Sequence, residues 1–159
     1  MKVLFISLGC DKNLVDSEEM LGLLRDRGYE ITDDETEADV IAINTCCFIH
    51  DAKEESIQSI LEMAEYRKQG RCKVLLVTGC MAQRYQKEIR QEIPEVDVVL
   101  GTTSFEKIVD ALDSAFRGIP YEDFESIDYL PMVSADRILT TGGYYGYLKI
   151  AEGCDKHCT

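Results

Sequence analysis

The sequence predicts an α/β fold, a doubly wound parallel sheet of four to five strands with helices on both faces. Short apolar runs alternate with longer amphipathic segments from residue 2 to residue 118. The runs are apolar without polar alternation, which is typical of strands buried on both faces. Because parallel strands are joined by helical crossovers, this alternation favours one sheet covered by helices on two sides.

Four strands are expected, each a continuous apolar run, and they span residues 2–8, 39–45, 73–79 and 96–101. Four such β-α units predict a flavodoxin-like sheet, for which we expect the strand order 2-1-3-4. A fifth strand could come from the sequence that follows. The 159 residues are enough for one domain with its own core.

The first two helices are predicted from their apolar stripes and end signals. The helix at 16–28 begins with Asp16 as a cap and Glu19 three residues on, and Gly28 can end it. The second helix spans about 52–69 and carries apolar residues at i, i+3, i+4 and i+7.

Two further helices are expected after the third strand. The third helix has apolar residues at four-residue steps and ends near a proline, at Tyr85, Ile89, Ile93 and Pro94. The pattern Thr103-x-x-Glu106 is that of a capping box, so it predicts the start of a fourth helix, which Gly118 ends.

Three parts of the chain are expected. Residues 1–118 form the α/β domain, residues 119–143 form a linker without clear periodicity, and residues 144–159 begin another domain with a strand-like run at 144–154. No apolar run approaches the about 20 residues that a membrane helix needs, so we expect no membrane contact.

The charge balance disfavours one class of partner. The chain has 17 basic and 30 acidic residues and a net charge of −13. An acidic surface repels phosphate backbones, so direct nucleic-acid binding by this segment is not expected. A basic protein is the partner that this charge favours.

Three of the seven cysteines follow the ends of three predicted strands. Cys10, Cys46 and Cys80 are 36 and 34 residues apart, yet the carboxyl ends of parallel strands meet at one edge of the sheet. Three converging thiolates suit an iron–sulfur cluster with one open iron, or zinc with an exchangeable ligand. Gly9 and Gly79 precede two of them, so we expect the backbone there to make room for a bulky ligand.

Other readings of the cysteines stay open. One alternative is that the three pack as small apolar residues of the core that happen to follow strands. Cys47 and Cys72 are interpreted as core or structural thiols. Cys154 and Cys158 form a C-x-x-x-C pair, which is a weak metal signal by itself.

Four polar residues close to the cysteines are candidates for hydrogen bonds to a cluster: Asn13, Asn44, Thr45 and Thr78. Hydrogen bonds to the sulfurs of a cluster tune its reduction potential. The alternative is that these residues only end strands or cap a helix.

Four blocks carry a family resemblance, in this order: "SLGCDKNLVDSEEMLGLL", "DVIAINTCCFI", "VLLVTGCMAQRY" and "YLKIAEGCDKHCT". The first three resemble the signature blocks of the N-terminal domain of radical-SAM methylthiotransferases, and the fourth resembles the start of their radical-SAM domain. The match covers nearly the whole chain, and each block contains a cysteine among the flanking residues that are typical of that block in the family.

The resemblance implies two 4Fe-4S clusters and S-adenosyl-L-methionine as cofactors in a full-length protein. Cys10, Cys46 and Cys80 would hold an auxiliary cluster. Cys154 and Cys158, with a third cysteine that would lie beyond residue 159, would hold the cluster that binds S-adenosyl-L-methionine. Without a complete radical-SAM domain, we expect this fragment to be catalytically inactive.

The segment "SLGCDKNLVDSE" is similar to the corresponding segment of the family branch that modifies a ribosomal protein (RimO-like). That branch implies methylthiolation of the β-carbon of an aspartate in small-subunit ribosomal protein number twelve, in the cytoplasm. Two alternatives remain: a tRNA adenosine (MiaB-like) methylthiotransferase domain, and a zinc-binding α/β module without catalysis.

Overall fold

The computed structural model describes residues 1–132 and 136–153, and it contains one parallel sheet of six strands in the order β2-β1-β3-β4-β5-β6. The strands are β1 (Lys2–Ser7), β2 (Glu30–Thr32), β3 (Val40–Thr45), β4 (Val74–Gly79), β5 (Val98–Leu100) and β6 (Tyr121–Asp123). The predicted α/β fold is confirmed, with one strand more than the four to five expected. The sequence missed β2 and β6, three-residue strands at the two edges that lack a continuous apolar run.

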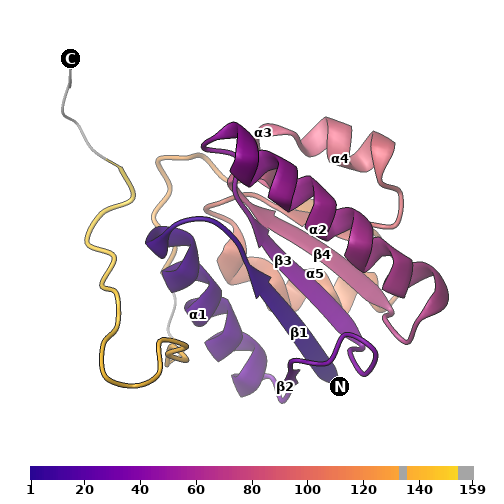
Figure 1. Ribbon diagram of the computed structural model, residues 1–159, viewed down its shortest axis with the longest axis horizontal. Helices are drawn as coiled ribbons and strands as arrows, with labels where there is room; N and C mark the ends of the chain where they lie inside the picture. Colours follow the sequence, from indigo (N-terminus) through magenta and orange to yellow (C-terminus); the bar gives the residue numbers. More distant parts are fainter. Residues whose placement is uncertain (133–135, 154–159) are drawn as a thin grey trace.

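Helices cover both faces of the sheet, as predicted (Figure 1). They are α1 (Asp11–Asp26), α2 (His50–Gln69), α3 (Cys80–Arg84), α4 (Gln86–Glu92) and α5 (Ile108–Ala115), with a short 3-10 turn η1 (Phe105–Lys107) before α5. Helices α1 and α5 pack on one face through Met20, Leu24, Ile108 and Leu112. Helices α2, α3 and α4 pack on the other through Ile60, Met81 and Ile89.

The order of the strands differs from the expected one in a single respect. Strand β2 takes the outer position beside β1, so the strand predicted at 39–45 lies between β1 and β4. All residues of β3 and β4 are buried, because these two strands form the centre of the sheet and have helices on both sides.

Two predicted helix starts are wrong. Helix α1 begins at Asp11 with Cys10 as its N-cap residue, and Asp16 lies inside the helix, paired with Lys149. Thr103 and Glu106 form no capping box: the Thr103 hydroxyl donates to main-chain carbonyls at 125 and 126, and the Glu106 carboxylate accepts from the Tyr129 hydroxyl. Long-range partners therefore replace the local ones.

The third predicted helix is interrupted. Tyr85, with φ −120° and ψ 34°, separates α3 from α4, so two short helices replace one.

The segment after α5 is tied to the domain. Residues 121–123, within the predicted linker, form β6 and pair with β5. The strand-like run predicted at 144–154 forms no strand over 144–153, and this part lies beside α1 instead (Figure 1). Over the ranges 1–132 and 136–153, no helix is long and apolar enough to span a membrane.

The central strands should carry most of the stability of the sheet. We expect Ile41→Ala in β3, where the side chain is 0% exposed, to lower the free energy of unfolding by about 2–5 kcal/mol. Ile31→Ala in edge strand β2, where the side chain is 42% exposed, should cost less than about 1 kcal/mol. Urea denaturation of both variants measures the difference, and equal losses would contradict the observed burial.

Candidate metal centre

The register of three adjacent strands brings Cys10, Cys46 and Cys80 to one edge of the sheet. Ser7 at the end of β1 is paired with Asn44 of β3, and Thr45 of β3 is paired with Gly79 of β4. The three cysteines follow these strand ends and line one hollow of about 1000 Å³. Cys10 is exposed, Cys80 is half-buried and Cys46 is buried. The predicted convergence of the trio is therefore observed.

Gly9 allows the first cysteine loop to lie against the second. Its φ is +96°, and a Cβ atom added there would lie 2.6 Å from the Cβ of Cys46 and 2.9 Å from its Sγ. The room that we predicted for a bulky ligand at this glycine is thus occupied by Cys46 itself.

Gly79 plays the same part between the second and third loops. Its φ is +93°, and an added Cβ would lie 2.2 Å from Oδ1 of Asn44 and 2.5 Å from the carbonyl oxygen of Thr45. Glycine is required at this position because the end of β3 lies against it. Any space for a ligand lies in the hollow in front of the thiols.

Asn13 contacts all three cysteine loops. Its buried side-chain amide donates to the carbonyl of Leu8, 3.0 Å away, and to the carbonyl of Thr45, 3.1 Å away. Its Oδ1 lies 3.8 Å from Sγ of Cys80. This residue, in the first turn of α1, therefore joins the loops that carry Cys10, Cys46 and Cys80.

The other three polar candidates hydrogen-bond to protein groups. The Asn44 amide donates to the main-chain carbonyl of Asn13 at 2.9 Å and to the Ser17 hydroxyl at 3.0 Å. The Thr45 hydroxyl donates to the carbonyl of Thr78. All three residues are buried. The Asn44 amide ties the end of β3 to α1, and the Thr45 hydroxyl ties it to the end of β4.

Ser56 is a positioning residue that the sequence analysis missed. Its hydroxyl accepts from the main-chain N–H of Cys46 at 3.0 Å and donates to the carbonyl of Cys46 at 2.9 Å. Ser56 is fully buried on α2, four residues before Ile60 and eight before Ala64, both in the core. A polar residue in step with a buried apolar stripe was the signal that could have revealed it.

The thiols disfavour one another's ionisation. The pKa of the Cys80 thiol is raised to about 11, first by burial and then by the neighbouring sulfurs of Cys46, Cys47 and Cys10. A metal cation in the hollow would reverse this effect, because it stabilises thiolates directly. The free N–H groups in the first turn of α1, next to Cys10, also favour negative charge there. Three soft donors around one hollow fit iron–sulfur or zinc chemistry.

The remaining cysteines divide into two groups. Cys72 is buried beside the start of β4, and its thiol donates to the carbonyl of Val74 at 3.2 Å, so it is a core thiol as interpreted. Cys47 is half-buried and packs against the core next to the trio. Cys154 and Cys158, predicted as ligands of a second cluster, lie outside the described residues.

The fold and the site define a class, a parallel α/β domain with a cysteine trio at three adjacent strand ends. Residues 2–101 match the model of the family described as "Uncharacterized protein family UPF0004", and the chain belongs to this family. The resemblance to the N-terminal domain of methylthiotransferases is confirmed by its relatives.

The relatives share one name, "Ribosomal protein uS12 methylthiotransferase RimO". The protein from Lachnoclostridium phytofermentans is 66% identical over 159 residues, which are 100% of this chain and 36% of the relative. The protein from Desulforamulus reducens is 51% identical over 154 residues, 96% of this chain and 35% of the relative. The protein from Symbiobacterium thermophilum is 48% identical over 158 residues, which are 99% of this chain and 33% of the relative. The chain thus spans about a third of the length of these relatives.

Two glycines test the contact between the first two cysteine loops. We expect Gly28→Ala to lower the free energy of unfolding by about 1 kcal/mol, because its φ is +90° and nothing lies within 4 Å of the added Cβ. Gly9→Ala should lower the free energy of unfolding by about 1–3 kcal/mol more than Gly28→Ala, because it adds overpacking against Cys46 to the same backbone strain. Thermal and urea unfolding compare the two variants, and equal losses would mean that the loops do not touch.

Alkylation tests the exposure of the thiols. In the metal-free folded chain, we expect maleimide to modify the exposed Cys10 well before Cys72, which is 3% exposed and whose pKa is raised by burial. Peptide mass spectrometry at successive times gives the order. Simultaneous labelling in a chain that remains folded would contradict the burial of Cys72.

Proposed function

We propose that Cys10, Cys46 and Cys80 hold a 4Fe-4S cluster with one iron open to an exchangeable ligand. The observation that carries the proposal is that three thiols from three adjacent strand ends line one open hollow. Three protein sulfurs leave one iron of such a cluster without a protein ligand. The shared hollow leaves room in front of the trio for a substrate or cofactor.

The residues of this chain bind and orient the cluster. Gly9 and Gly79 allow the three loops to approach one another, Asn13 ties the loops together, and Ser56 fixes the main chain at Cys46. Asn13 is also the residue whose side chain reaches a ligand sulfur, at Cys80. The open iron of a cluster held there would carry the sulfide or methyl sulfide that is transferred.

For the full-length protein we propose the activity in the relatives' name, methylthiolation of ribosomal protein uS12 with S-adenosyl-L-methionine. The acceptor is the β-carbon of an aspartate, as the RimO-like sequence around Cys10 implies. Cys154 and Cys158 would contribute to the second cluster, and the 159 residues alone would not turn over. The protein would work in the cytoplasm, where thiols stay reduced.

The surface charge supports a basic protein substrate. The net charge is −13, and the rim of the hollow includes Asp51 and Glu55 next to the exposed Phe48. A negative rim attracts a basic polypeptide and repels a phosphate backbone. This favours a ribosomal protein over the tRNA of the alternative branch.

Metal reconstitution tests the proposed centre. After anaerobic reconstitution, we expect about four iron and four sulfide per chain, as a 4Fe-4S cluster contains. Cys10→Ser, Cys46→Ser and Cys80→Ser should each lose most of the iron, because each removes one of three protein ligands. The matched control Cys72→Ser should keep it, because Cys72 lies in the core.

Two outcomes would overturn this proposal. A folded chain that takes up no iron would show that the trio does not suffice to bind a cluster. Zinc bound in place of iron, with the same dependence on the three cysteines, would favour the structural zinc module.

A further inference from the structure

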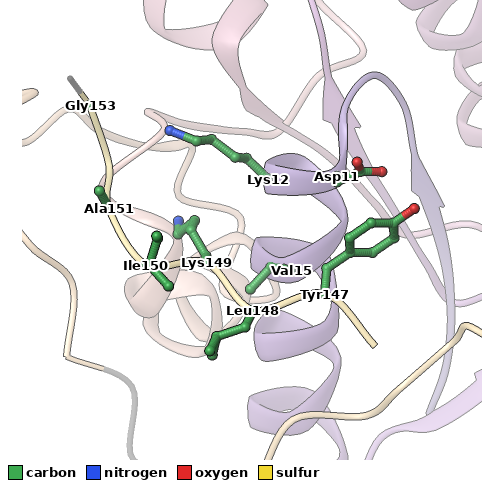
Figure 2. A pocket seen from close by; sticks show the side chains of 9 residues that line it. All are labelled: Asp11, Lys12, Val15, Tyr147, Leu148, Lys149, Ile150, Ala151 and Gly153. Carbon is green, nitrogen blue, oxygen red and sulfur yellow. The ribbon is translucent and has the colours of Figure 1, made fainter. Parts of the chain in front are cut away.

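The last described residues run along α1 without forming a helix or a strand. We refer to residues 136–153 as the α1 strap. Figure 2 shows its residues 147–153 beside the N-terminal half of α1, with a hollow of about 300 Å³ between them. The strap reaches residues in the first turn of α1 and as far along it as Arg25, whose guanidinium donates to the carbonyl of Asp136 at 3.1 Å.

Glu18 forms the first anchor of the α1 strap. Its side chain is 1% exposed, and its carboxylate accepts from the N–H of Thr140 at 2.6 Å and from the Thr140 hydroxyl at 2.9 Å. The Arg137 guanidinium lies 3.3 Å away, and the Ile138 N–H donates to the carbonyl of Glu18. A glutamate is almost never fully buried unless it is paired, and the strap provides each of these partners.

Asp16 forms the second anchor, two residues closer to Cys10 on the same helix. It pairs with Lys149, and both side chains are largely buried, at 14% and 11% exposed. Lys149 also pairs with Glu152, whose carbonyl accepts from Lys12 at 3.2 Å. Burial raises the pKa of Asp16 to about 6 against the opposing effect of Lys149, so burying this carboxylate has an energetic cost.

Apolar packing does not explain why the strap lies where it does. Its large aliphatic side chains are mostly exposed, with Leu148 at 82% and Ile150 at 89%. A ladder of main-chain hydrogen bonds, which fixes the register of a strand, is also missing over 136–153. The anchors at Glu18 and Asp16 are therefore the features that select one alignment of the strap on α1.

Buried ion pairs are suited to this task. Their desolvation cost offsets much of their attraction, so they add little net stability, but a shifted alignment would leave buried charges without partners. The spacing of the two anchors defines a single register: Arg137 and Thr140 lie at Glu18, and Lys149 lies at Asp16.

We propose that Asp16 and Glu18 are positioning residues that set the register of the α1 strap. Gly153, the last described residue of the strap, then lies beside the first turn of α1, where it lines the same hollow as Asp11 and Lys12 (Figure 2). Asp11 follows Cys10, and Gly153 precedes Cys154 in sequence. The register therefore brings the residue after Cys10 close to the residue before Cys154. That this matters for two groups of metal ligands rests on the proposed function, whereas the register itself does not depend on bound iron.

Zero-length cross-linking of the metal-free chain tests the register. A carbodiimide joins a lysine amine to a carboxylate in direct contact, so the unaltered chain should give an Asp16–Lys149 cross-link by mass spectrometry. Glu18→Gln should lower its yield about tenfold, because losing a charge-assisted anchor elsewhere on the strap lets the alignment open. Glu18 contacts neither residue of the cross-link through any hydrogen bond among the described residues, so a merely local effect would not change this yield.

Glu92→Gln is the matched control. It makes the same change in charge and shape at an exposed position of α4, which packs on the other face of the sheet from α1 and the strap. Its cross-link yield should match that of the unaltered chain. Arg137→Gln removes the same anchor from the strap side and serves where Glu18→Gln does not fold, as judged by circular dichroism.

The proposal fails in either of two cases. One is a cross-link at full yield in folded Glu18→Gln or Arg137→Gln, which would mean that the anchor does not set the register. The other is the absence of the cross-link in the unaltered chain, which would mean that the strap does not lie along α1. Because the experiment uses no metal, neither result depends on whether the cysteine trio binds iron.

Discussion

The alignment of β1, β3 and β4 is the constraint on which the candidate centre depends. Because the strands are parallel and in register, their carboxyl ends lie at one edge, and the residues that follow must share the space above it. Cysteines 36 and 34 residues apart in sequence thereby line one hollow. The central strands are buried on both faces, so a slip in their register would exchange the side chains packed against the two helix layers and separate the thiols.

Close approach of the three loops is achieved with few residues. Two glycines at positive φ remove the side chains that would hold the loops apart, and Asn13 supplies hydrogen bonds between them. Ser56 satisfies both main-chain groups of the buried Cys46. These are neutral, fully paired contacts, so they fix the thiols without adding charge to the site.

Helix α1 has two tasks at once. Its first turn follows Cys10 and carries Asn13, while Asp16 and Glu18 hold the α1 strap. A rigid helix that contacts both parts relates the position of the cysteine trio to the position at which the chain continues. Contact with the strap is also the reason that Asp16 and Glu18 are buried instead of being exposed to solvent.

The sequence by itself determined the parallel α/β fold, the central strands and the cysteine trio, because these depend on local apolar patterns and on where each strand ends. Only the tertiary structure decided the edge strands, the true start of α1 and the partners of Asn13 and Glu18. Those partners are 32 and 122 residues distant in sequence, at Thr45 and Thr140. A local pattern carries no record of such contacts, since they form only after the chain has brought distant segments together.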